Sequence, residues 1–131
     1  MNVAELIERA QRLGIEIDYC PMRDKDSIAI LYPCGSLCIN CLITDEQWQK
    51  EILAHEIGHW VTGGFYTDTY DKTYKAKCEY RAMRKAVDLL VPYQDYKKAL
   101  RSGVVELWEL AEYFDVPEDV IKQAVSCYSR N

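Results

Sequence analysis

The two histidines of the chain, His55 and His59, lie four residues apart, and Glu56 follows the first of them. Together they form the pentapeptide HEIGH, which matches the metal-binding pattern H-E-x-x-H. Because a helix turns by about 100° per residue, both imidazoles fall on one helical face and can bind a single cation. Glu56 is displaced round the helix, where it can reach a metal-bound water without binding the metal. The pattern therefore predicts a zinc site in which Glu56 is the catalytic residue.

A zinc ion in a catalytic site takes three protein ligands and leaves one position for water, and the chain has no third histidine. Glu79 lies twenty residues after His59, at the head of an apolar row on the next predicted helix. The row continues with Ala82, Met83, Ala86 and Leu90. A carboxylate on such a row needs a cation, because burying it unpaired would be very costly. We expect His55, His59 and Glu79 to hold one zinc ion per chain. The alternative is a pair of core histidines beside a solvated acid at the start of a helix.

The elements that must position these residues follow from periodicity and turn residues. The patterns predict strands over 15–20, 28–32 and 37–42, the last two joined as a hairpin through Pro33 and Gly35. Thr44 with Gln47 three residues later is typical of a capping box, which would start the HEIGH helix. Six helices are expected, over 3–13, 44–62, 74–90, 94–101, 104–114 and 117–128.

Length and composition favour one compact domain. The chain has 131 residues, of which 49% are hydrophobic and 28% charged, so it can bury a core. Asp and Glu number 21 against 16 Lys and Arg, which gives a net charge of -5 and argues against binding to nucleic acid. No apolar run approaches the length of a membrane span. Glu5 and Glu8 stand where a signal peptide would be basic and then apolar, so we expect a cytoplasmic protein.

Six cysteines are present, and three of them, Cys34, Cys38 and Cys41, lie close together. Their spacing lacks the paired C-x-x-C units of structural zinc sites. In a reducing compartment free thiols are the default. We therefore predict buried or half-buried structural thiols, with a second metal site as the alternative.

The motifs together resemble the ImmA/IrrE family of metallopeptidases, compact zincins often encoded by phages and mobile elements. The residues that carry the resemblance are LAHEIGH at 53–59, EYRA at 79–82 and LLVPY at 89–93. The tail at 104–125 is also similar to the family's C-terminal helices. The sequence departs at Met83, where many relatives have Asp or Asn, a group that can orient a ligand histidine.

The resemblance implies an α+β fold, with a small three-stranded sheet and an H-E-x-x-H helix in a minimal zincin core over 1–92. A C-terminal helical subdomain over 93–131, similar to a helix-turn-helix, would pack on that core. It implies His55, His59 and Glu79 as zinc ligands and Glu56 as the catalytic glutamate. The implied function is zinc-dependent cleavage of a protein, the helix-turn-helix repressor of a phage or mobile element.

The substrate-binding residues follow in part from the resemblance. Zincins hold the substrate as an added strand at a sheet edge, and the resemblance places that edge at 37–42. The residues concerned are Leu37, Cys38, Ile39 and Asn40. Tyr66, Tyr70 and Tyr74 are candidate donors to the oxyanion.

The tail raises two alternatives to proteolysis. Its apolar seam is predicted from Trp108, Leu110, Ala111 and Phe114 on one helix and Val120, Ile121, Ala124 and Val125 on the next. A DNA-binding regulator is one alternative, but Glu118 and Asp119 would face phosphates unfavourably. The other is a metal-bound protein that sequesters a repressor without cleaving it. We expect the tail to dock a protein partner, and neither DNA nor a membrane.

Overall fold

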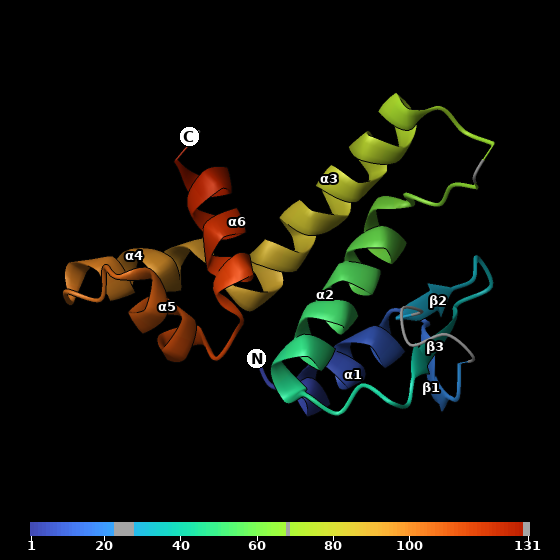
Figure 1. The fold of residues 1–131 in the computed structure, drawn as a ribbon, viewed down its shortest axis with the longest axis horizontal. Coiled ribbons are helices and arrows are strands. Elements are labelled where there is room, and N and C mark those ends of the chain that lie inside the picture. Colours follow the sequence, from blue (N-terminus) through green and yellow to red (C-terminus); the bar gives the residue numbers. More distant parts are fainter. Residues whose placement is uncertain (23–27, 68, 130–131) are drawn as a thin grey trace.

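A small sheet and a pair of long helices form the part of the molecule that carries the histidines. The computed structural model describes residues 1–22, 28–67 and 69–129, which fold as α+β. Helix α1 (Val3–Arg12) precedes strands β1 (Glu16–Cys20), β2 (Ala29–Leu31) and β3 (Ser36–Asn40). Helices α2 (Glu46–Thr62) and α3 (Lys72–Leu90) follow and run side by side (Figure 1). The chain ends in helices α4 (Tyr93–Arg101), α5 (Leu107–Phe114) and α6 (Glu118–Tyr128).

The strand order is β1-β3-β2, so β3 is the central strand. It pairs in parallel with β1 and antiparallel with β2, and its register sets Leu37 against both Ile17 and Leu31. Leu37 and Ile39 are fully buried, because they lie on the face of the sheet that is turned toward the helices. The expectation that 37–42 forms a sheet edge is therefore wrong. Strand β2 lies at the edge of the sheet instead. It has only three residues, so its sequence gives little indication of its place in the sheet.

Close contact between α2 and α3 depends on Gly58, which lies within the HEIGH motif. A Cβ atom at this position would stand 2.4 Å from the carbonyl oxygen of Ala82. Leu53, Ile57 and Val87 are buried between these helices and the rest of the core. The small residues at the crossing therefore let the α3 backbone approach the turn that carries both histidines.

The start of α2 differs from the predicted capping box. Asp45, one residue later than Thr44, is the N-cap, and its side chain accepts a hydrogen bond from the Trp48 backbone N–H at 3.1 Å. Gln47 is thereby free to donate to the Asp115 carboxylate at 3.1 Å, which joins the first turn of α2 to the corner after α5. A carboxylate is as good a cap as a hydroxyl, so the sequence offered two neighbouring candidates. The helix ends as predicted, at Gly63 with φ 67°.

The three C-terminal helices gather at one end of α3 (Figure 1) and share the core with the rest of the chain. Leu110, Val116 and Ile121 are buried in the same cluster as Leu53. The Tyr128 hydroxyl donates a hydrogen bond to the Val91 carbonyl oxygen at 2.5 Å. A boundary at residue 92 between two subdomains stays a prediction.

The predicted seam between α5 and α6 is correct for its central residues and wrong for two at its margins. Leu110, Ala111 and Ile121 are buried, whereas Trp108 is 58% exposed and Val125 is 41% exposed. Helix α5 begins at Leu107 rather than at Val104. A turn of about 100° per residue carries Trp108 and Val125 away from the buried stripes of their own helices.

The cysteines of the 34–41 segment are more exposed than expected. Cys34 and Cys41 are exposed and Cys38 is half-buried, whereas Cys78 and Cys127 are buried. Cys34 and Cys41 lie just outside the two ends of β3, in turns that the sheet does not cover. Among the helices described, none is both long and apolar enough to cross a membrane.

Candidate metal centre

Two facing helices bring the predicted ligands together. His55 and His59 stand one turn apart on α2, and Glu79 reaches them from the second turn of α3. One donor atom from each residue lies within 4.8 Å of the other two. The His55 Nε2 atom is 2.9 Å from the Glu79 Oε2 atom and 3.1 Å from the His59 Nε2 atom. The His59 Nε2 atom is 3.2 Å from the other Glu79 oxygen.

These separations suit one tetrahedral cation. Bonds of about 2.0–2.1 Å at tetrahedral angles place neighbouring ligand atoms about 3.3 Å apart. The observed distances of 2.9–3.2 Å are close to that spacing. The Nδ1 atom of His59 lies 2.9 Å from the buried Gly64 carbonyl oxygen, so this ring donates there and directs its Nε2 atom to the shared point. Two imidazoles and one carboxylate with an open side are a donor set typical of catalytic zinc.

The pKa values of Glu79 and His55 are both shifted by their surroundings. Burial disfavours ionisation of Glu79, but the hydrogen bond from Tyr66 and the two histidines outweigh it and hold the pKa of this carboxyl below its usual value. Burial, reinforced by His59, lowers the pKa of His55. A neutral imidazole and an ionised carboxylate are the forms that bind a metal, so both directions favour a metal-ready site.

Glu56 lies beside this cluster in a hollow of about 290 Å³. Burial raises the pKa of its carboxyl, against the attraction of His59 and with a further contribution from Glu79. The hollow is lined by residues of β2, by His55, Glu56 and His59, by Phe65 and Tyr66 of the loop after α2, and by Glu79. A carboxylate with a raised pKa next to three candidate metal ligands is suited to accept and return a proton.

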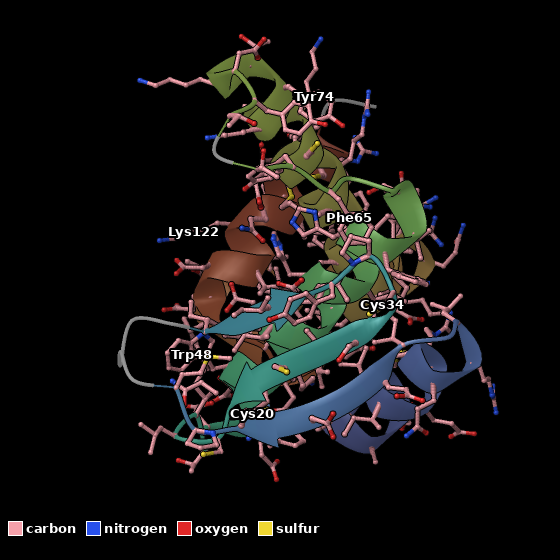
Figure 2. The ribbon with its side chains drawn as sticks, turned by 90° about the vertical axis from the view of Figure 1, so that its right-hand side faces the viewer. Cys20, Cys34, Trp48, Phe65, Tyr74 and Lys122 are labelled. Atoms are coloured by element: carbon pink, nitrogen blue, oxygen red, sulfur yellow. The ribbon has the colours of Figure 1, made fainter. Side chains whose placement is uncertain are left out.

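The three predicted tyrosines have different positions. Tyr66 lines the hollow, and its hydroxyl donates a hydrogen bond to the Glu79 Oε1 atom at 2.6 Å. Tyr70 and Tyr74 are both exposed, and their rings lie 4.8 Å apart, outside the set of residues that line the hollow. Tyr74 stands toward the start of α3 in Figure 2, beyond the loop that carries Phe65. The structure therefore brings only Tyr66 to the metal centre.

The four residues predicted on β3 do not line the hollow. Leu37 and Ile39 are buried in the core, and Cys38 is half-buried on the outer face of the sheet. Asn40 is buried, and its side-chain oxygen accepts the backbone N–H of Leu42 at 3.1 Å. As a substrate edge these residues are a wrong prediction, because strands on both sides already pair with β3.

The open edge beside the metal centre belongs to β2. The Ile28 carbonyl oxygen accepts a hydrogen bond from the Asn40 N–H at 2.9 Å, and the Tyr32 N–H donates one to the Ser36 carbonyl oxygen at 2.8 Å. Because hydrogen bonding alternates along an antiparallel pair, the backbone groups of Ala29 and Leu31 point away from β3. Both residues line the hollow with the histidines. The sequence did not predict Ala29 and Leu31 as site residues, because the pattern of apolar and polar residues along a strand does not show which strands lie beside it.

Met83 lies on the side of α3 that faces α6. Its sulfur accepts a weak hydrogen bond from the Cys127 thiol at 3.7 Å. It packs against the apolar core, as the predicted row of residues on α3 requires. Met83 is thus a packing residue, and the ring held by a hydrogen bond to the backbone is that of His59, through Gly64.

Comparison with known proteins adds a family and a fold. The family model Peptidase_M78, described as IrrE N-terminal-like domain, matches residues 10–126. No curated protein matches the chain in sequence. A solved structure described as a Mycobacterium tuberculosis transcriptional regulator superposes with a TM-score of 0.70 at 15% identity. The match covers 95% of this chain and 48% of the other, so the chain spans about half the length of that structure. At this identity the likeness shows a shared fold.

Proposed function

The chain belongs to the family Peptidase_M78, the IrrE N-terminal-like domain, and from this premise we propose that it is a zinc-dependent endopeptidase. Membership supports a function of the metallopeptidase type. The observation that carries the proposal is the convergence of His55, His59 and Glu79 from two helices, with Glu56 in the same hollow. An open strand edge lies at that hollow, which is where an extended peptide would add to the sheet.

The residues of the chain divide the chemistry between them. Zinc, held by His55, His59 and Glu79, would lower the pKa of a water molecule and polarise the scissile carbonyl. Glu56 takes a proton from the attacking water and passes it to the leaving amine. Tyr66, whose hydroxyl donates to Glu79 in the structure, is the tyrosine placed to turn toward the developing oxyanion.

The backbone of β2 would hold the substrate. Ala29 and Leu31 each offer an N–H and a carbonyl oxygen on the open side of the strand, beside His55 and Glu56. A peptide paired to these groups is fixed in an extended form across the metal centre. Positioning of this kind makes a large contribution to catalysis, because the entropy of alignment is lost on binding rather than in the transition state.

For the substrate we propose a DNA-binding repressor of the helix-turn-helix type, encoded by a phage or another mobile element. The resemblance of the motifs to peptidases that act on such repressors supports this class. Glu118 and Asp119 open α6 on its exposed side, and a basic DNA-binding protein would be attracted to them. The solved structure with a similar fold is described as a transcriptional regulator, which is consistent with a substrate that acts in transcription.

The test is cleavage of a purified repressor encoded next to the gene of this chain. We expect the zinc-loaded protein to produce defined fragments, which mass spectrometry would locate, and a chelator to stop the reaction. Glu56→Gln should bind the repressor and leave it intact. If the intact repressor is instead inactivated equally well by Glu56→Gln, the protein acts by sequestration and the proposed peptidase function is wrong.

A further inference from the structure

A second hollow adjoins the metal centre on the other side of His55. It measures about 330 Å³ and lies between α2 and the start of β2. On α2 its walls are Trp48, Glu51, Ile52, His55 and Glu56, spaced three and four residues apart along one helical face. Ala29, His55 and Glu56 also line the metal hollow. A peptide that runs along β2 through the metal centre therefore carries one of its side chains into this second hollow.

The apolar walls of the second hollow are Ile28, Ala29, Trp48 and Ile52. Ile28 is 41% exposed and Trp48 is 40% exposed, whereas Ile52 is buried at the floor. Trp48 lies beside the start of β2 in Figure 2. A hydrocarbon chain placed here would cover the exposed parts of Ile28 and Trp48 and so remove apolar surface from water.

The hollow also has two carboxylates in its wall, Glu51 and Glu56, and Glu51 is the one that the proposed peptide hydrolysis does not use. Glu51 is half-buried, and within the described residues it has neither a hydrogen bond nor an ion pair. Burial raises the pKa of the Glu51 carboxyl, and the negative charge of Asp119 on α6 raises it further. Both effects are costs that a cation in the hollow would reduce, because it would compensate the charge of Glu51.

An apolar cleft with carboxylates in its wall matches a side chain that has a hydrocarbon stem and a positive head. We propose that this hollow binds an arginine or lysine side chain of the substrate, close to the scissile bond, with Glu51 as the specificity-determining residue. The stem would pack on Ile28 and Trp48, and the indole face of Trp48 would attract the cation as well. This inference rests on the proposed peptidase function, because it assigns the second hollow to the same substrate.

Amino-acid hydroxamates test the inference without any turnover. The hydroxamate group binds zinc, so arginine hydroxamate and norleucine hydroxamate present the metal with the same group and differ in the charge of the side chain. Isothermal titration of the zinc-loaded protein should show the arginine compound binding at least tenfold more tightly. In Glu51→Gln, with zinc content measured alongside, that preference should fall to within about twofold, because the paired charge is lost.

Trp48→Ala should weaken both compounds, since it removes the apolar wall that they share. Equal binding of the two hydroxamates to the wild type, or tighter binding of norleucine hydroxamate, would overturn the assignment of a basic side chain while leaving the metal centre intact. If neither compound binds the zinc-loaded protein better than the metal-free protein, the metal centre itself is contradicted, and the proposed function fails together with the subsite. The persistence of the arginine preference in Glu51→Gln would show that another residue supplies it.

Discussion

At the scale of single residues, Gly58 decides whether the two halves of the metal centre can meet. It lies between His55 and His59, on the side of α2 that faces away from solvent. The Ala82 backbone passes so close that a side chain here has no room. Glu79 lies one turn before Ala82 on the same helix, so the distance between the helices at Gly58 also sets how far Glu79 stands from the histidines.

We predict that Gly58→Ala pushes α3 away from α2 and weakens metal binding by tenfold or more. Overpacking of this kind also costs about 1–3 kcal/mol in the free energy of unfolding. The measurements are zinc affinity, by competition with a chromogenic chelator, and chemical unfolding. Val61→Ala, at a position 49% exposed on the same helix, is the matched control. Wild-type zinc affinity in Gly58→Ala would show that the close approach is not needed for the site.

The ligand set was open to prediction because it depends on local periodicity. His55, His59 and Glu56 are within one turn of one helix, and Glu79 is marked by the apolar row that follows it. No sequence pattern indicates a role for Glu51, because the residues around it come from the start of β2 and from α6, which are distant in the chain. The sequence did not identify Asp45 as the N-cap of α2, because the neighbouring Thr44 is also a favourable N-cap residue.

Among the elements, the short strand β2 is the sheet edge that lines the hollow, and we propose that the substrate pairs with it. The strand predicted over 37–42 is confirmed as β3, but its sequence does not show which strands lie on either side of it. The order β1-β3-β2 arises because β1, far back in the chain, pairs in parallel with β3 and covers its second side. Long-range pairing of this kind leaves no signal in either strand alone, so the substrate edge could not be located from sequence.

We predict that Leu31→Pro impairs cleavage and leaves the metal in place. Proline removes the outward N–H of residue 31, which does not pair with β3, so the sheet keeps its own hydrogen bonds. Leu31→Val, which keeps the N–H and an apolar side chain, is the comparison. The expected result is a drop in kcat/KM at least tenfold larger for proline than for valine, at equal zinc content. Equal values in the two variants would place the substrate away from β2.

At the scale of the whole molecule, the net charge of -5 is compatible with a protein partner of opposite charge. Glu118 and Asp119 project from the exposed start of α6, at the end of the molecule where the C-terminal helices gather (Figure 1). Asp119 also raises the pKa of Glu51, so this acid contributes to the potential at the second hollow. Charge of one sign spread over a surface speeds the encounter with an oppositely charged partner.

We predict that reversing Glu118 and Asp119 to lysine slows repressor cleavage through slower association, and that raised salt slows the wild type likewise. Reversal of Glu16 and Asp18, on the outer face of β1, is the control for net charge. Stopped-flow association rates should fall about tenfold in the first variant and less than threefold in the second. If salt and the α6 reversals leave association unchanged, or if the intact protein binds duplex DNA at physiological salt, docking by the tail is wrong.

We propose that His55, His59 and Glu79 hold one zinc ion, whereas Glu56, which adjoins them, does not bind it. Elemental analysis of the wild type, Glu56→Gln and His59→Ala, each purified in the presence of zinc, tests it most directly. We expect one tightly bound zinc per chain in the wild type and in Glu56→Gln, and none in His59→Ala, with proteolysis retained only by the wild type. Loss of the metal from Glu56→Gln, or two tightly bound zinc ions in the wild type, would contradict the account.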